Sequence, residues 1–389
     1  MLKALLIGAL LMVPADATVI AARSDPAVRQ IATTQEGAVA VATPKPTRAF
    51  TALFAKAEAH AKAGRIPATR QAKLRWVLTT ALADVDRHLA PAKPYKEVGG
   101  TRKVGCTGFW VTPQGHMVTA ASCTGLEGKA LLAYFAQGTT GLMTENVKAF
   151  TAKHKITEAD LIDLATRLFT AFDHKHRRLT KSKTTIVLVG KGAPALSVVA
   201  RGARWPGADF ALLKARGMKN LPTLPLGGGV AVGDMLYGNG YPEVSWEFDE
   251  KSAARPTLAK GIVNAKRVTV GKVTYLQTQM PIYPGSQGGP VFDRHGKVVG
   301  TSVAVATDER VGGATENSTF VLPVGVIRQQ LAEAGVTPVL SRTSSLYFSA
   351  LDDYFARRHK PALLKFRQVL RLHPQHLYVR GYIAELTAR

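Results

Sequence analysis

Short runs of β-forming residues, separated by Gly, Pro and Asn, dominate this chain from about residue 97 to residue 338. The clearest runs are Gly108 to Val111, Met117 to Ala120, Thr184 to Val189, Phe210 to Leu213 and Val298 to Val305. Strands of this length, bounded by turn residues, are typical of an all-β sandwich or barrel. The chain has 389 residues, of which 46% are apolar, so it can bury a sizeable core in about two domains. We therefore predict a mainly β fold.

Helical periodicity replaces this pattern on both sides of the β-rich region and once within it. Over 49–92 two apolar stripes separated by a Gly and Pro break predict a helical hairpin. Another stripe, with Thr157 as N-cap, predicts a helical insertion over about 142–182. Residues 344–389 are helical again and partly resemble a tetratricopeptide repeat (TPR). One copy lacks the stacked neighbours that a repeat needs, so we favour a C-terminal helical hairpin docked on the β-rich domain.

The N-terminus predicts export. A basic start is followed by an apolar run from Ala4 to Val13 and by Ala15-Asp-Ala17, which is typical of a signal peptide over 1–17. A membrane anchor would need about 20 apolar residues, and no later segment provides them. We expect a secreted or periplasmic protein whose mature chain has no transmembrane segment. Residues 18–48 fit no period and are predicted to form a flexible tether.

The charge balance points to anionic partners. Lys and Arg total 51 against 27 acidic residues, which gives a net charge of +24. Nucleic acid, an acidic membrane face or an acidic polymer would attract such a chain. Export argues against nucleic acid, and the usual interleaving of aromatic and basic residues is absent. An anionic envelope polymer stays as an alternative partner, which the basic residues within 175–183 would contact.

The chain has two cysteines, Cys106 and Cys123. In an exported protein an even pair suggests a disulfide, which would stabilise a loop of this size by about 3 kcal/mol. The alternative is two buried free thiols, and the two residues alone do not decide between them.

The glycine-rich segment from Leu276 to Pro290 is the most informative string. It reads Leu-Gln-Thr-Gln-Met-Pro-Ile-Tyr-Pro-Gly-Ser-Gln-Gly-Gly-Pro and is followed by a further strand pattern that ends at Gly300. Glycines adopt backbone torsions that are closed to other residues. They also let amide N–H groups converge on one point, as the stabilisation of an oxyanion in acyl transfer requires.

This segment resembles the nucleophile loop of the HtrA-like (Do-like) branch of trypsin-fold serine proteases. Other segments match that family in the expected order, and together they cover roughly 97–338. These segments are 106–115, 118–123, 208–214, 233–242, 260–263 and 319–323. The resemblance implies a two-β-barrel chymotrypsin/trypsin-like fold and a disulfide between Cys106 and Cys123. It also implies an oxyanion hole made by the backbone N–H groups of Gly285 and Gln287. HtrA relatives usually carry a PDZ domain after the protease, but the residues after the barrel are helical here, so we expect none.

Two of the three catalytic positions depart from the family pattern. The histidine position holds Ser122 and the nucleophile position holds Gln287, whereas the aspartate is retained as Asp209. A triad needs an imidazole that titrates near neutral pH and a hydroxyl or thiol nucleophile. A serine hydroxyl does not titrate in that range, and an amide is not a usable nucleophile. We expect the Ser122 hydroxyl to donate a hydrogen bond to Asp209, because burying an unpaired carboxylate is costly.

Other nearby residues do not restore the chemistry in this interpretation. Ser286 stands one residue too early on a tight turn, and His116 occupies an outward position of the hairpin that carries Ser122. No metal site or cofactor is expected, because the histidines near the insertion lack carboxylate or thiol neighbours at ligand spacing.

Four functions follow as hypotheses. The first is an inactive protease homologue that binds a protein or peptide partner as a scaffold in the envelope. The alternatives are an active serine endopeptidase with a rearranged site, a basic docking module for an anionic envelope polymer, and, least supported, a nucleic-acid-binding protein.

Overall fold

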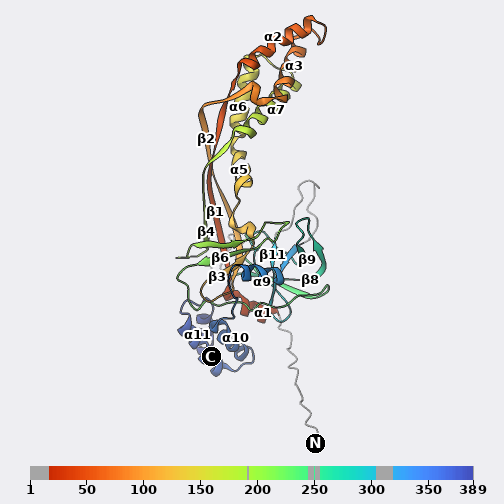
Figure 1. Ribbon diagram of the computed structural model, residues 1–389. Coiled ribbons are helices and arrows are strands. Elements are labelled where there is room, and N and C mark those ends of the chain that lie inside the picture. Colours follow the sequence, from red (N-terminus) through yellow and green to blue (C-terminus); the bar gives the residue numbers. More distant parts are fainter. Residues whose placement is uncertain (1–16, 191, 244–248, 250–254, 304–318, 389) are drawn as a thin grey trace. The chain divides into compact units, whose positions relative to one another are not determined.

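The computed structural model describes residues 17–190, 192–243, 249, 255–303 and 319–388 (Figure 1). Apart from Ala17, the predicted signal peptide lies outside the described residues. The chain forms two compact units. The first, which we call the barrel unit, comprises the residues up to Thr34, Lys103–Gly125 and the residues from Thr185 onward. The second, the helical unit, comprises Gln35–Arg102 and Leu126–Thr184.

Two β-sheets provide the strands, and their order confirms the predicted mainly β fold. The first sheet has the order β4-β1-β2-β3-β6-β5, and an isolated bridge between Val187 and Ala195 joins its two outer ends. Its strands are β1 (Val28–Pro46), β2 (Leu89–Trp110), β3 (His116–Thr119), β4 (Arg178–Leu188), β5 (Leu196–Arg201) and β6 (Ala211–Ala215). The second sheet is a closed barrel in the order β10-β11-β12-β9-β8-β7. Its strands are β7 (Met235–Gly240), β8 (Thr257–Val268), β9 (Thr274–Thr278), β10 (Pro290–Phe292), β11 (Val298–Val303) and β12 (Thr319–Pro323).

Cross-strand apolar residues fix the register of the first sheet. Phe109 of β2 lies opposite Val118 of β3, which lies opposite Leu212 of β6. All three are fully buried in one core cluster with residues of the closed barrel. Burial of each such side chain contributes about 1.5–3 kcal/mol, so a slip of one residue would be costly. This register pairs Thr119 at the end of β3 with Ala211 at the start of β6, so Ser122, which follows β3, and Asp209, which precedes β6, come close together.

The prediction of a flexible tether over 18–48 is wrong. This segment forms nearly all of α1 (Ala17–Ser24), a 3-10 turn (Asp25–Ala27) and the whole of the long strand β1. Ile20 and Ile31 are buried in the barrel unit, and β1 pairs between β4 and β2 in the first sheet. Residues 38–42 of β1 are all buried. They therefore lack the alternation of apolar and polar side chains by which a half-buried strand is predicted from a sequence.

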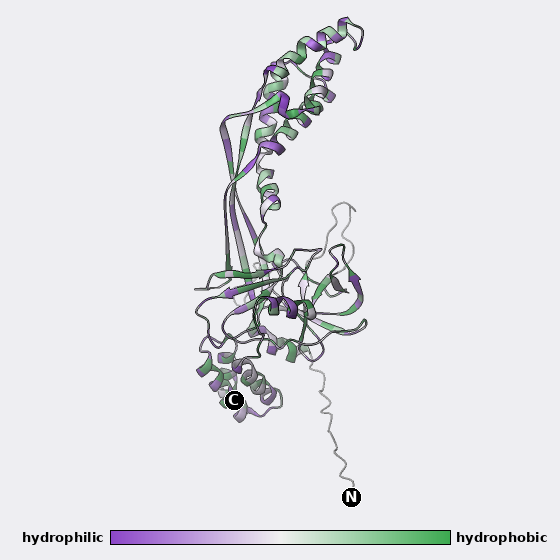
Figure 2. Cartoon of the chain, viewed as in Figure 1, coloured by the Kyte–Doolittle hydropathy of each residue, from purple (hydrophilic) through white to green (hydrophobic). Residues whose placement is uncertain are grey.

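Amphipathic helices make up most of the helical unit, and Figure 2 shows hydrophobic and hydrophilic residues alternating along them. They are α2 (Arg48–Lys62), α3 (Arg70–Ala83), α4 (Val85–His88), α5 (Gly128–Ala136), α6 (Thr140–Lys153) and α7 (Ala159–His176). Helix α3 packs against α2 and α7, around buried Phe50, Leu78 and Leu168. The insertion was predicted to begin at about residue 142, but α5 already begins at Gly128. Residues 178–182, which were predicted to belong to the insertion, are part of β4. The N-cap of α7 is Glu158 and not Thr157.

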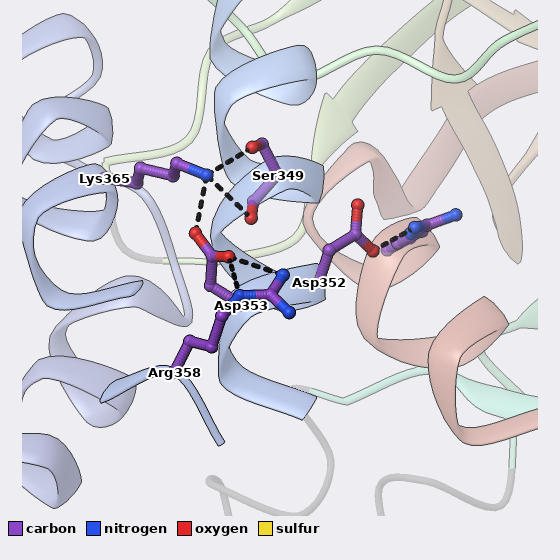
Figure 3. Close-up of polar contacts among 6 residues, drawn as sticks. Ser349, Asp352, Asp353, Arg358 and Lys365 are labelled. Atoms are coloured by element: carbon purple, nitrogen blue, oxygen red, sulfur yellow. Dashed lines mark hydrogen bonds and ion pairs between the residues drawn. The ribbon is translucent and has the colours of Figure 1, made fainter. Parts of the chain in front are cut away.

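Four helices follow the closed barrel. Helix α9 (Val324–Glu333) packs Ile327 and Leu331 into the barrel core. The C-terminal segment forms three helices, α10 (Arg342–Phe355), α11 (His359–Leu372) and α12 (Val379–Thr387), where the sequence predicted a hairpin. Figure 3 shows Asp353 of α10 held by Arg358 and by Lys365 of α11. In the described part of the chain, no helix is long and apolar enough to cross a membrane.

Candidate functional site

The β2–β3 hairpin presents Ser122. A short 3-10 turn, Ala121–Thr124, follows β3, and a disulfide between Cys106 and Cys123 ties this turn to β2. The hydroxyl of Thr33 donates to the carbonyl of Cys123 at 2.6 Å. The turn is thus held from two sides, which fixes the position of Ser122 at the end of the first sheet.

Asp209 lies directly beside this turn. It precedes β6, is only 1% exposed, and accepts a hydrogen bond of 2.8 Å at Oδ1 from the backbone N–H of Ser122. Burial raises the pKa of the Asp209 carboxyl above its usual value. Hydrogen bonds from the backbone and side chain of Ser122, and the positive charge of Arg204, oppose this increase in pKa. The structure therefore brings the retained aspartate and the residue at the histidine position together.

Arg204 is a site residue that the motifs did not reveal. Its guanidinium donates to the carbonyls of Ser122 and Gly125 at 2.8 and 2.9 Å, which holds its charge near Asp209. A buried carboxylate that has lost an imidazole partner needs another compensating charge. The sequence offered two signals that could have indicated Arg204. A buried Asp209 needs a compensating positive charge, and Arg204 lies five residues before it.

The glycine-rich loop brings Gln287 to the same place. The backbone N–H and the hydroxyl of Thr107 donate to the carbonyls of Gln287 and Gly285, each at 2.8 Å. Gly285 has φ +89°, and a Cβ there would collide with the backbone of Tyr241 and Glu243. Only glycine fits this position, which explains one part of the loop's sequence.

A hydrogen bond links the side chains of Ser122 and Gln287. The side-chain amide Nε2 of Gln287 donates to the hydroxyl Oγ of Ser122. Gln287, Ser122 and Asp209 thus form a continuous hydrogen-bonded chain at the three positions that the sequence motifs predicted as the site. An amide and a hydroxyl can hold this arrangement, but neither can abstract a proton near neutral pH.

Two backbone donors remain for a ligand. Within the described residues, the N–H groups of Gly285 and Gln287 make no hydrogen bond. Paired backbone N–H groups of this kind can bind a carbonyl or carboxylate oxygen.

The adjoining cavity is small. Its volume is about 20 Å³, and its lining includes Asn239, Tyr283, Ser286 and Ser302. A cavity of this size holds about one water molecule. It does not admit a large side chain in the conformation that the structure shows.

The other residues considered from the sequence have different contacts. His116 places Nδ1 2.9 Å from the hydroxyl of Thr112 within its own hairpin, and burial lowers the pKa of its imidazole. The carbonyl of Ser286 accepts hydrogen bonds from Ser302 and Gly289. Among the residues that the structure describes, no group of three or more His, Cys, Asp or Glu side chains could hold a metal ion.

A family model described as "Trypsin-like peptidase domain" matches residues 106–300, which is about half of the chain and includes Ser122, Asp209 and Gln287. This chain belongs to that family. The assignment to an HtrA-like trypsin-fold family is confirmed, and the hydrogen-bonded chain of three residues lies within the matched trypsin-like domain.

Curated relatives carry the same kind of domain. Two proteins from strains of Pseudomonas putida, each named "Probable periplasmic serine endoprotease DegP-like", are 38% identical to this chain over 138 residues. The alignment covers 33% of this chain and 26% of each relative, so the chain spans about a quarter of the length of the relatives it matches. A solved structure of "HtrA-type protease AlgW with decapeptide" has a TM-score of 0.41 and 16% identity. That comparison covers 83% of this chain and 69% of the other.

Three of the five Lys and Arg residues within 175–183 form ion pairs inside the helical unit. Lys175 lies 2.7 Å from Asp86, Arg177 lies 3.3 Å from Asp173, and Lys181 lies 3.6 Å from Glu97. Arg178 stacks on the ring of Tyr95. The ion pairs reduce the charge that this segment offers to an anionic polymer, and Arg178 keeps its charge in the contact with Tyr95.

Proposed function

We propose that this protein is an inactive trypsin-like protease homologue that binds protein or peptide segments as a scaffold in the cell envelope. The hydrogen bond from the Gln287 amide to the Ser122 hydroxyl carries this proposal. It joins two side chains without acid–base or nucleophilic function at the centre of an otherwise family-like site. The DegP-like relatives are named as periplasmic proteins, which supports a periplasmic location for this chain.

Acyl transfer has two requirements, a nucleophile and a proton-transferring group, and neither is met by Gln287 or Ser122. Acyl transfer needs a nucleophile, and the carboxamide of Gln287 is too weak to form an acyl-enzyme. It also needs a group that takes and returns a proton, and the hydroxyl of Ser122 has no useful pKa for this. Neither replacement alone would leave a working triad, so two independent losses support inactivity.

Peptide binding at this site would depend on backbone groups of the glycine-rich loop and not on side chains. The N–H groups of Gly285 and Gln287 can hold a peptide carbonyl, and this requires only the loop geometry that the glycines maintain. The Gln287 side chain and the small adjoining cavity restrict what enters. We expect extended peptide backbone to bind without a deeply inserted side chain.

Fluorescence anisotropy with a labelled unfolded protein, followed by intact-mass analysis, tests the proposal. The wild type should bind the unfolded protein and return it uncut. Gln287→Ala should bind it more tightly, because the side chain no longer occupies the site, whereas Gln329→Ala on the exposed face of α9 should not change binding. Cleavage by the wild type would contradict inactivity, and an absence of binding would contradict the scaffold role.

A further inference from the structure

A cavity unrelated to the trypsin-like site opens in the helical unit. Its volume is about 590 Å³, within the usual range for small-molecule sites. Helices α2 and α3 and the end of α6 with the following turn supply its walls. Its lining residues are Phe54, Ala57, Glu58, Arg70, Lys73, Leu74, Lys153, His154 and Lys155.

The floor of the cavity is apolar and aromatic. Ala57 and Leu74 are buried in the helical core, and Phe54 packs against that core. The ring of Phe54 stacks on the imidazole of His154, with 5.2 Å between ring centroids and 10° between planes. A flat or aliphatic ligand body could lie on this surface and remove apolar area from water.

The rim of the cavity is cationic. Four cations face one carboxylate, Glu58, which is already paired with Lys73 at 2.7 Å. Arg70 donates to the backbone carbonyls of His154 and Lys155, so it shapes the turn and keeps its charge at the cavity. Burial lowers the pKa of His154, and the neighbouring Lys153 and Arg70 lower it further.

Lys153 and Lys155 remain available to a ligand. Within the described residues, neither ammonium is paired with a carboxylate, and both side chains are exposed at the cavity. Lys155 has a left-handed backbone, with φ 47°, which is uncommon for a residue other than glycine. The Arg70 contact with its carbonyl holds this conformation, so the two lysines flank an apolar floor from a fixed turn.

We propose that this cavity binds a small anionic amphiphile, whose apolar body lies on Phe54 and Leu74 and whose carboxylate or phosphate group contacts Lys153 and Lys155. The charge of the rim selects the anion, and the apolar floor distinguishes an amphiphile from a free inorganic ion. This site is separate from the trypsin-like centre and does not depend on the scaffold function proposed above.

Isothermal titration calorimetry on the full chain tests this assignment, with octyl phosphate and octanoate as probes. Inorganic phosphate tests the head group alone, octanol tests the apolar body alone, and octyltrimethylammonium reverses the charge. We expect both anionic amphiphiles to bind more tightly than these three, and their affinity to fall as salt rises from about 50 mM to about 500 mM.

Substitutions distinguish binding at this cavity from nonspecific attraction of the anion to the positively charged protein surface. The double variant Lys153→Gln/Lys155→Gln should lower the affinity for octyl phosphate about fivefold to tenfold, because two exposed charge contacts are lost. The matched control Lys148→Gln, an exposed lysine of α6 outside the cavity, should change the affinity by less than about twofold. All three substitutions lie on the surface, and circular dichroism would verify that the variants fold.

Four results would overturn the proposal. The first is an unchanged affinity in the double variant, and the second is an equal loss in the control. The third is equal binding of the cationic amphiphile, which would indicate adsorption to apolar surface. Preferential binding of an acidic peptide with the same dependence on Lys153 and Lys155 would also overturn it and identify the cavity as a peptide site.

Discussion

At the scale of single residues, Ser122 and Arg204 decide what stabilises the buried carboxylate of Asp209. The backbone N–H and side chain of Ser122 supply hydrogen bonds, and Arg204 supplies a positive charge. Burial nevertheless raises the pKa of Asp209, so the folded state binds its proton more tightly than the unfolded state does. The ionised form is therefore a cost to folding that Arg204 reduces.

Replacement of this cation gives a test at the same scale. Arg204→Met should destabilise the folded protein by about 2–4 kcal/mol at pH 7, because it leaves the buried Asp209 carboxylate less compensated. The loss should be smaller in acid, where Asp209 is protonated. Urea unfolding at pH 7 and pH 4 measures both values. Arg328→Met is the control, because Arg328 also donates to two backbone carbonyls, those of Leu226 and Gly227. An equal pH dependence in the two variants would contradict the pairing of Arg204 with Asp209.

The positions of Ser122, Asp209 and Gln287 could be predicted because each lies in a motif with a fixed order along the chain. Their mutual contacts could not, because a hydrogen bond between an amide and a hydroxyl depends on rotamers that no spacing encodes. Arg204 escaped prediction for a similar reason. It compensates a residue five positions away, and only the fold shows that its guanidinium turns back to the Ser122 turn.

At the scale of elements, the N-terminal segment differs most from the prediction. Short strands with alternating side chains were predictable, but β1 is buried on consecutive residues over 38–42 and shows no period. Val39 and Val41 pack against α5, whereas Ala42 packs into the core of α2, α3 and α7. Different neighbours thus bury successive residues, and a sequence pattern alone does not reveal this.

The turn after α1 contains a titrating group. Asp25 accepts a hydrogen bond of 2.8 Å from the side-chain amide of Asn239, and burial raises its pKa from 3.8 to about 6, while Arg255 opposes the increase. A raised pKa in the folded state means that the folded state holds a proton that the unfolded state has lost. Stability should therefore fall as the pH rises from about 4 to about 6 and level off above that window.

Asp25→Asn should abolish this part of the pH dependence, because its amide carries no charge at any pH. Relative to the wild type, the variant should gain about 2–3 kcal/mol between pH 4 and pH 7. Chemical denaturation across this range measures the difference. Asp163→Asn, at an exposed carboxylate, should show no such gain. A flat difference between Asp25→Asn and the wild type would show that Asp25 is not buried in solution.

At the scale of the whole molecule, two units with separate cores share one chain. The helical insertion was predictable from its apolar stripe, but parts of β1, β2 and β4 also belong to the helical unit. The sequence did not show this, because a strand that continues from one unit into the other is not interrupted at the boundary between them. Pro and Gly residues indicate a domain boundary only where a helix or strand ends at that boundary.

Separate cores predict separate unfolding. Calorimetry should resolve two thermal transitions, because each unit buries its own apolar cluster. Leu168→Ala should destabilise the helical unit by about 2–5 kcal/mol and lower one transition only. Leu212→Ala should lower the other, since Leu212 is buried in the barrel unit. One transition that shifts equally in both variants would contradict independent units.

Fluorophosphonate labelling tests the central claim, that two replacements removed the chemistry from an intact trypsin-like frame. The wild type would be compared with Ser122→His, Gln287→Ser and the double variant, with cleavage of an unfolded protein measured in parallel. We expect no labelling or cleavage by the wild type or by Ser122→His, and labelling of the double variant at residue 287. Wild-type turnover that survives repurification and the Ser286→Ala substitution would contradict this claim, because another group would then supply the nucleophile.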